Sequence, residues 1–170
     1  RRSSDLTGAI GSRVAELCHL FGCEIAAYDL FPKKNAPEYL HYGTLEEVLS
    51  KSDIVTLHCP LTEDSRNLIN QDRIAQMKKG AILINAARGP IVDSKALADA
   101  LNSGYLRGAG VDVFEMEPPL PMDHPLLHSI NTIVTPHIAF ASDESMEIRA
   151  KIVFENIQKW MNKEQVNTIL

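Results

Sequence analysis

The stretch that decides the fold is MKKGAILINAARGPIVDSKALADALNSGYLRGAGVDV, residues 77–113. Continuous apolar runs at 81–85 and 109–113 have the length and composition of strands that are buried on both faces of a parallel sheet. Between them, Asp93 can cap a helix over 94–103, and Gly104 is a natural stop for that helix. Strand, helix and strand in this order predict a βαβ unit with two parallel strands.

The same alternation extends over the rest of the chain. A capping-box pattern from Thr44 to Glu47 opens a short helix that is expected to end at Leu49. Residues 115–129 are rich in proline, which predicts a loop. The whole pattern predicts an α/β fold, a Rossmann-like doubly wound parallel sheet in three α/β/α layers. Further strands are expected at 24–28, 53–58 and 131–135, and further helices at 12–21, at 70–79 before Gly80, and at 143–161.

Composition excludes several classes of partner and site. The net charge is -5 in 170 residues, so the chain lacks the basic surplus that a nucleic-acid-binding face needs. No apolar run approaches the roughly 20 residues of a membrane span. The three cysteines form no C-x-x-C pair, which argues against a disulfide framework or a zinc site. We expect small buried thiols in a reducing, cytoplasmic compartment and no metal.

Three polar side chains follow predicted strands. Arg88 lies after 81–85, Glu117 after 109–113 and His137 after 131–135. Right-handed crossovers bring the carboxyl ends of parallel strands to one edge, where open α/β sheets bind ligands. A guanidinium can hold a carboxylate by two hydrogen bonds, and an imidazole beside a carboxylate can exchange a proton near neutral pH. This combination suits reduction of a 2-keto acid.

The start of the chain contains half of a dinucleotide-binding motif. Gly8 and Gly11, followed by Ala15, match the second half of G-x-G-x-x-G-x-x-x-A. Gly8 would let the backbone approach a pyrophosphate at a helix N-terminus, and Gly11 would allow close helix–strand packing. Asp29 ends the next predicted strand, where a carboxylate binds the adenosine ribose and repels a 2′-phosphate. NAD is therefore favoured over NADP, although Lys33 and Lys34 lie nearby.

The first half of that motif is atypical. Leu6 stands where the first glycine is expected, and residues 1–5 have no strand pattern. The first strand is central in a doubly wound sheet, so its loss exposes two neighbouring strand edges. Three interpretations stay open: the chain is a fragment, another segment fills the position, or the domain is only marginally stable.

The chain resembles the NAD-binding domain of the D-isomer-specific 2-hydroxyacid dehydrogenase family. The resemblance covers about residues 7–167 and rests on TGAIGSRVA (7–15), DIVTLHCPLTEDSRNLIN (53–70), MKKGAILINAARGPIVD (77–93), GAGVDVFEMEPP (108–119) and NTIVTPHIAFAS (131–142). It implies that Arg88 binds the substrate carboxylate and carbonyl, that His137 is the acid/base, and that Glu117, rather than Glu115, pairs with the imidazole. It implies cofactor contacts from Gly8, Ala9, Ile10, Gly11, Asp29, His58, Cys59, Pro60, Thr62, Ala86, Ala87, Arg88, Asp112, His137 and Ala139.

The resemblance also implies an organisation. The family carries a second domain, about 100 residues long, that precedes the cofactor domain and closes over the substrate. Residues 1–170 are then a single dinucleotide-binding domain with an atypical start at 1–6 and a tail at 162–170 that returns to the other domain. Met146, Phe154 and Trp160 of the last helix are core or interface residues, and this family's contacts there suggest a homodimer. The expected partner is a small 2-hydroxy or 2-keto acid, with no nucleic acid or membrane.

Other interpretations remain. A corepressor-like protein that senses NAD has similar catalytic residues and is an alternative from another functional class. A truncated, inactive dehydrogenase is a third possibility, because Leu6 departs from the motif. Glu117 is also compatible with a solvated loop carboxylate. His58 fits a packed residue and a cofactor contact equally well. The structural or exposed histidines are expected to be His19, His41, His124 and His128.

Overall fold

The computed structural model describes residues 8–116, 119–164 and 166–167. These residues belong to two compact units, which divide between Pro136 and His137. The first unit carries both sheets of the molecule, and the second carries one long helix.

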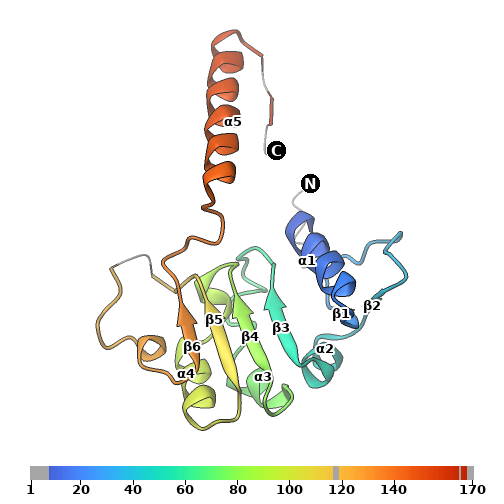
Figure 1. The fold of residues 1–170 in the computed structure, drawn as a ribbon, viewed down its shortest axis with the longest axis vertical. Helices are drawn as coiled ribbons and strands as arrows, with labels where there is room; N and C mark the ends of the chain where they lie inside the picture. The colour runs from blue at the N-terminus through green and yellow to red at the C-terminus, as the bar shows by residue number, and fades with distance from the viewer. Residues whose placement is uncertain (1–7, 117–118, 165, 168–170) are drawn as a thin grey trace. The chain divides into compact units, whose positions relative to one another are not determined.

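The larger sheet of the first unit is parallel and four-stranded, in the order β3-β4-β5-β6 (Figure 1). Its register pairs Val55 with Leu83 and Leu83 with Ala109. The strands expected around 53–58, 81–85, 109–113 and 131–135 are confirmed, each slightly shorter than its pattern. Their bounds are β3 (Ile54–Leu57), β4 (Ile82–Asn85), β5 (Gly108–Val111) and β6 (Thr132–Val134).

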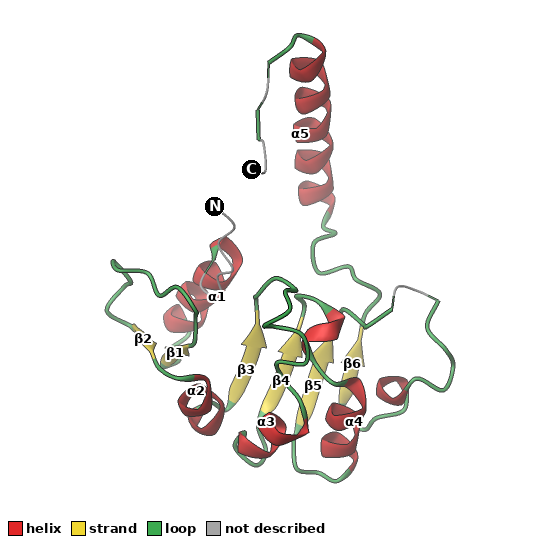
Figure 2. Ribbon diagram, turned by 180° about the vertical axis from the view of Figure 1, so that it is seen from behind, coloured by secondary structure: helices red, strands yellow, loops and turns green. Residues whose placement is uncertain are grey.

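One face of this sheet carries the core. Helices α3 (Gln71–Gln76) and α4 (Ser94–Asn102) lie across it in Figure 2. Every second residue of each strand turns to this face, where Leu83 is fully buried against Leu97 and Leu101 of α4. Burying side chains of this size contributes about 1.5–3 kcal/mol each, so this cluster stabilises the packing of the helices on the sheet.

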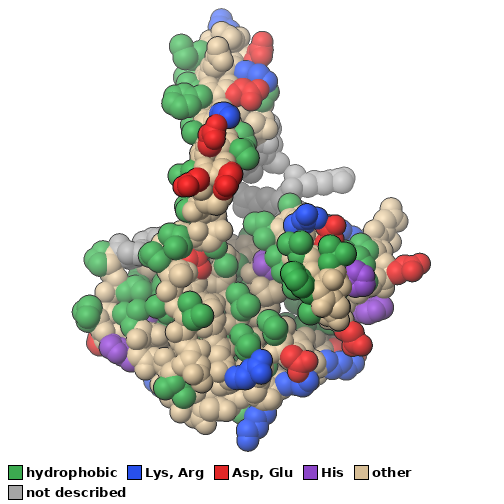
Figure 3. Space-filling model, in the orientation of Figure 1, with side chains coloured by type: hydrophobic (Ala, Val, Ile, Leu, Met, Phe, Trp, Pro, Cys, Tyr) green, Lys and Arg blue, Asp and Glu red, His purple; other side chains and the backbone are tan. Residues whose placement is uncertain are grey.

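The opposite face stays accessible in the described part of the first unit. The register aligns Ile84 with Gly110, and Gly110 with Ile133. Ile133 is 73% exposed, and Ile54 and Ile84 are exposed too. Figure 3 shows hydrophobic side chains gathered over these strands. Both faces of the strands are therefore apolar, as the continuous apolar runs predict, but only one of them is packed.

A second, two-stranded sheet lies near the start of the chain. Helix α1 (Ala9–Leu20) leads into β1 (Ile25–Ala27), which pairs in parallel with β2 (Leu40–Tyr42); helix α2 (Leu45–Lys51) follows. Among the residues described, no strand joins β1 to β3, so the parallel sheet is in two pieces. The position expected for a first strand, before Gly8, lies outside the described residues. Strand β2 was not expected.

Helix α3 ends earlier than its sequence pattern indicates. Its last residue is Gln76, and Met77 already has an extended ψ of 154°. Met77 is buried in the core, and its extended backbone directs the side chain there instead of continuing the helix. Gly80, expected as the helix stop, instead has a φ of 83° and donates its N–H to the Tyr105 carbonyl in the turn before β4. The expectation for Gly80 was wrong because a tertiary contact decides the boundary.

The remaining helices agree better with their patterns. Helix α4 is one residue shorter than expected, and α2 is longer by two. Helix α1 starts at Ala9, three residues before its pattern. The proline-rich segment contains one short 3₁₀ helix, η2 (Pro125–Leu127), and a second such turn, η1 (Gly89–Ile91), follows β4.

The second unit consists mainly of α5 (Asp143–Met161), whose bounds match the predicted helix. None of its residues is buried, and Met146, Phe154 and Trp160 are exposed. A core role for these three side chains is therefore wrong for the chain as described, and an interface role stays a prediction. None of the helices in the described ranges combines the length and apolar character needed to cross a bilayer.

The cysteines divide into two kinds. Cys59 is buried, as expected, but Cys23 is exposed and Cys18 is half-buried. The expectation of three buried thiols was wrong because the turn after α1 leaves Cys23 at the surface. In the described part of the chain, no group of three His, Cys, Asp or Glu side chains has a metal-binding arrangement.

Candidate functional site

The turn after β4 presents Arg88. Asn85, the last residue of β4, is almost completely buried, and its side chain holds the turn at two points. Its Oδ1 accepts a hydrogen bond from the Ala87 N–H (3.1 Å), and its Nδ2 donates to the Arg88 carbonyl (3.0 Å). An Asn amide offers both a donor and an acceptor, so one buried side chain fixes both backbone groups. Arg88 itself is exposed, and its Nη1 donates to the Ala87 carbonyl (2.6 Å).

The neighbouring loop after β5 lies directly against this turn. The Asp112 N–H donates to the Asn85 carbonyl (2.9 Å), which extends the β4–β5 ladder by one bond. Gly89 then touches the Phe114 backbone so closely that a Cβ at Gly89 would lie 1.8 Å from the Phe114 carbonyl carbon. Only glycine allows this approach. The structure therefore brings Arg88 and Asp112 to adjacent strand ends at the carboxyl edge of the sheet.

Asp112 is a buried carboxylate at this edge. Asp112 is 6% exposed, and its Oδ1 accepts a hydrogen bond from the Thr135 hydroxyl (2.5 Å). The Thr135 N–H donates to the Val111 carbonyl (3.0 Å), so Thr135 continues the pairing of β6 with β5. A buried carboxylate with a fixed hydroxyl donor is well suited to accept a further hydrogen bond from an amide group of a ligand.

His137 belongs to the second unit, so the structure does not relate its imidazole to Arg88. It follows β6 by three residues in the chain and has a φ of 56°, which is uncommon for a residue other than glycine. Its ring meets Phe140 edge to face, with centroids 5.8 Å apart. Such backbone conformations concentrate at functional sites. Ala139 is exposed in the same segment, and Glu117 lies outside the described residues.

The start of α1 has the features of an anion site. Gly8 is its N-cap, and within the described residues no side chain caps this end. A twelve-residue helix therefore presents free N–H groups and the positive end of its dipole at Ala9 and Ile10. Ile10 is exposed and Gly11 is buried. The Lys33 ammonium donates to the Ser12 hydroxyl (2.7 Å).

Asp29 and the loop after β3 lie close to one another. Asp29 is 6% exposed, two residues beyond β1, and its Oδ1 accepts from the Phe31 N–H (2.8 Å). Burial raises the pKa of the Cys59 thiol, and the negative charge of Asp29 raises it further. Burial lowers the pKa of His58, whose Nε2 lies 3.1 Å from the Thr56 hydroxyl. The segment after β1 thus carries one acidic side chain, Asp29. The segment after β3 carries two side chains, His58 and Cys59, whose charged forms are disfavoured by burial.

The rest of this loop is held by Ser65. Its hydroxyl donates to the Pro60 carbonyl (2.7 Å) and accepts from the Thr62 N–H (2.7 Å). Thr62 itself is exposed, so the turn has a fixed backbone and a free face. A rigid turn of this kind can border a ligand without being ordered by it.

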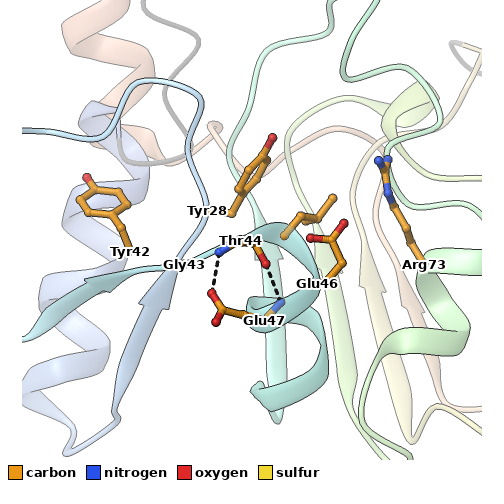
Figure 4. A pocket seen from close by; sticks show the side chains of 8 residues that line it. Tyr28, Tyr42, Gly43, Thr44, Glu46, Glu47 and Arg73 are labelled. Atoms are coloured by element: carbon orange, nitrogen blue, oxygen red, sulfur yellow. Dashed lines mark hydrogen bonds between the residues drawn. The ribbon is translucent and has the colours of Figure 1, made fainter.

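A depression beside α2 involves other residues. It is lined by Tyr28, Tyr42, Glu46 and Arg73, and Figure 4 shows these side chains around the start of α2. The dashed lines there mark the two bonds of the capping box between Thr44 and Glu47, which confirms that sequence pattern. None of the expected cofactor residues lines this depression, so it does not coincide with the site at the carboxyl edge.

The sequence patterns missed the residues that hold the site. Asn85 and Thr135 end or follow apolar runs, and a polar residue at such a position is a usable signal. Ser94 and His124, which are both buried, interact with Glu115 in the loop after β5. Their pairing joins residues far apart in the sequence, and no local pattern indicates it.

Comparison with known proteins places the chain in one family. Residues 7–139 match the family described as D-isomer specific 2-hydroxyacid dehydrogenase, NAD binding domain. A glyoxylate reductase of Korarchaeum cryptofilum is 43% identical over 152 residues, which are 88% of this chain and 46% of the relative. A glycerate dehydrogenase of Methylorubrum extorquens is 39% identical over 95% of this chain and 50% of the relative. The chain thus spans about half the length of these relatives.

Solved structures agree with this relationship. A D-lactate dehydrogenase of Treponema pallidum superposes with a TM-score of 0.89 at 35% identity, over 96% of this chain and 54% of that protein. A D-lactate dehydrogenase of Lactobacillus jensenii, solved with NAD+, has a TM-score of 0.86 at 33% identity, over 96% of this chain and 53% of that protein. The chain belongs to the D-isomer specific 2-hydroxyacid dehydrogenase family and forms its NAD-binding domain.

Proposed function

We propose that this chain is the cofactor half of a dehydrogenase that interconverts a D-2-hydroxy acid and its 2-keto acid. The observation that carries the proposal is the Arg88 turn, residues 85–94. Asn85 fixes the backbone on which the exposed Arg88 stands, and the buried Asp112 lies at the end of the adjacent strand. The substrates named for relatives, among them glyoxylate, glycerate and D-lactate, define the substrate class. Residues 1–170 act in this proposal as one dinucleotide-binding domain.

Each site residue has a distinct task. NAD, when bound, supplies or accepts the hydride. Arg88 binds the substrate carboxylate and polarises the C2 carbonyl by charge-assisted hydrogen bonds. His137 gives a proton to the C2 oxygen in reduction and removes it in oxidation. Glu117 stabilises the imidazolium form of His137.

The remaining residues fit the cofactor. The uncapped start of α1 suits a pyrophosphate, the buried Asp29 carboxylate suits a ribose diol, and Asp112 suits the nicotinamide amide. Cofactor contacts from the loops after β3 and β4 and from the segment after β6 complete the set. These are proposed for His58, Cys59, Pro60, Thr62, Ala86, Ala87 and Ala139.

A fluorescence titration of the chain with NADH and NADPH tests the cofactor site. We expect saturable binding of NADH with at least a tenfold preference over NADPH, which corresponds to about 1.4 kcal/mol. Asp29→Asn keeps the size of the side chain and its ability to accept from Phe31, but it removes the charge that repels a 2′-phosphate. The preference should fall in this variant. An unchanged preference would contradict the role of Asp29, and binding of neither cofactor would contradict the proposed site.

Turnover tests the catalytic roles in the full-length enzyme that carries this chain. Arg88→Ala and His137→Ala should each remove most of the activity, and full activity in either variant would overturn the assignment. Arg88→Lys keeps the charge and loses the bidentate geometry, so we expect it to raise the KM of the keto acid.

The proposal extends to partners and location. A homodimer is proposed because α5 exposes Phe154, Ile157 and Trp160, and such side chains are common at interfaces. A cytoplasmic location is proposed because the cysteines are free, which suits a reducing compartment.

A further inference from the structure

Glu115 joins three segments of the first unit. Its Oε2 accepts a hydrogen bond from the Ser94 hydroxyl (2.7 Å), at the first residue of α4. Its Oε1 lies 3.1 Å from Nε2 of His124, at the start of η2. One carboxylate at the start of the loop after β5 thus reaches the first residue of α4, at the end of the Arg88 turn, and the start of η2 later in the same loop.

The two partners of Glu115 are themselves fixed. Only 3% of the His124 side chain is exposed, its Nδ1 accepts from the Leu126 N–H (3.3 Å), and its ring meets Phe114 edge to face at 5.3 Å. With Nδ1 accepting, the hydrogen on Nε2 points to Glu115. Burial alone would raise the pKa of Glu115, but hydrogen bonds from Ser94, from the backbone and from His124 lower it below its ordinary value. The carboxylate is therefore ionised at neutral pH.

The Arg88 turn is held at both ends and in its middle by the neighbouring loop. At its start Asn85 accepts from the Asp112 N–H, and at its end Ser94 donates to Glu115. In the middle Gly89 touches the backbone of Phe114 and Glu115. The contacts of Ser94 and Gly89 depend on where Glu115 lies, and the contact between Asn85 and Asp112 does not. Displacement of Glu115 would change the contacts at Gly89 and Ser94 and leave those of Asn85 to hold the backbone of Arg88.

We propose that Glu115 is a positioning residue: with Ser94 and His124 it fixes the Arg88 turn in the geometry that binds the substrate carboxylate. The inference rests on the proposed function of Arg88. It also explains why two glutamates lie so close in the sequence. Glu115 has both carboxylate oxygens occupied by Ser94 and His124, whereas the role proposed for Glu117 needs an oxygen that is available to an imidazole.

Steady-state kinetics of the full-length enzyme test this. Glu115→Gln can accept from Ser94 with its oxygen, but its NH2 group then faces the donor on His124. We expect the KM of the keto acid to rise about tenfold or more, with the KM of NADH changed less than twofold. Ser94→Ala should raise the KM of the keto acid by a smaller factor. Ser94→Thr keeps the hydroxyl and should have a KM of the keto acid close to the wild-type value. Glu63→Gln, at an exposed loop carboxylate, is the matched control.

A double-mutant cycle separates positioning from a general structural effect. In an Arg88→Lys background, which has lost the bidentate fork, Glu115→Gln should lower kcat/KM much less than in the wild-type background. Equal losses in both backgrounds, or an unchanged KM of the keto acid in Glu115→Gln, would overturn the proposal.

Hydrogen exchange provides a readout that does not need activity. The Ile91 and Val92 amides donate to the Arg88 and Gly89 carbonyls, so Glu115→Gln should speed their exchange while leaving that of β3 unchanged. Unchanged protection of these two amides would overturn the positioning role. If instead the amides exchange faster in Glu115→Gln but Arg88→Lys has normal kinetics, the function proposed for Arg88 has failed. The positioning of the Arg88 turn by Glu115 then still stands.

Discussion

Gly89 is the residue on which the contact between the two edge loops depends. A Cβ there would lie 1.8 Å from the carbonyl carbon and oxygen of Phe114 and 2.4 Å from the Glu115 nitrogen, so the backbone would have to move. We expect Gly89→Ala to lower the free energy of unfolding by about 1–3 kcal/mol, the range typical of overpacking. Urea denaturation of the chain measures this.

Gly110→Ala is the matched control. Its Cβ would meet only Ile84 side-chain atoms at 3.9–4.0 Å, which is ordinary van der Waals contact. Where alanine fits without strain, it stabilises by about 0.4–1 kcal/mol through the unfolded state. Equal unfolding midpoints for the two variants would contradict the close approach at Gly89.

His58 gives the chain a predictable dependence on pH. Burial lowers its pKa from the ordinary value of 6.5, so between that value and the lowered one the folded state binds fewer protons than the unfolded state. Stability is then fully present above pH 6.5 and is lost as the pH falls through the pKa of the folded state. The urea midpoint should fall less between pH 7 and pH 5 in His58→Gln than in the wild type. Parallel pH profiles would show that His58 is not the group responsible.

At the scale of single elements, helix α4 depends on its N-cap. Asp93 Oδ1 accepts from the Ala96 N–H (2.9 Å), and α4 places Leu97, Ala98 and Leu101 in the core. Asp93→Ala should lower the free energy of unfolding by about 1 kcal/mol. Asp93→Asn keeps an acceptor oxygen and should retain most of that stability. If both variants lose the same amount, the charge of Asp93 matters and the cap does not.

The elements that the sequence predicts well are those with local signals. Helix α5 has its expected bounds because Ser142 caps its start and the chain turns at Asn162. Strand β2 was missed because it is three residues long and only Leu40 in it is buried, so it has no apolar run. The end of α3 was missed because the burial of Met77 is a tertiary effect.

The site shows the same division. The position of Arg88 at the carboxyl edge follows from the rule for parallel strands, whereas Asp112 was indicated only by the family resemblance. The hydrogen bonds of Asn85 and the pairing of Glu115 with His124 do not follow, because they depend on which side chains meet between separate strands and loops. Sequence therefore predicts the edge at which Arg88 lies, and the structure adds the contacts that hold its backbone there.

At the scale of the whole molecule, apolar burial is unevenly distributed. The core cluster runs through β3, β4, β5 and α4 of the first unit, whereas α5 has no buried residue. Phe154, Trp160 and Met161 are each more than 70% exposed. Exposed apolar side chains in this number on one helix are typical of an interaction surface.

We therefore expect the chain to self-associate through α5. Sedimentation velocity should show a concentration-dependent dimer, and Phe154→Glu with Trp160→Glu should return it to monomer, because two carboxylates in an apolar contact are costly to desolvate. Gln158→Glu adds a charge at an exposed polar position of the same helix and should leave the dimer intact. A dimer that survives the double substitution would place the interface elsewhere. Open-ended association, in place of a dimer, would mean that the exposed face drives non-specific contacts, because a two-fold symmetric interface closes at two copies.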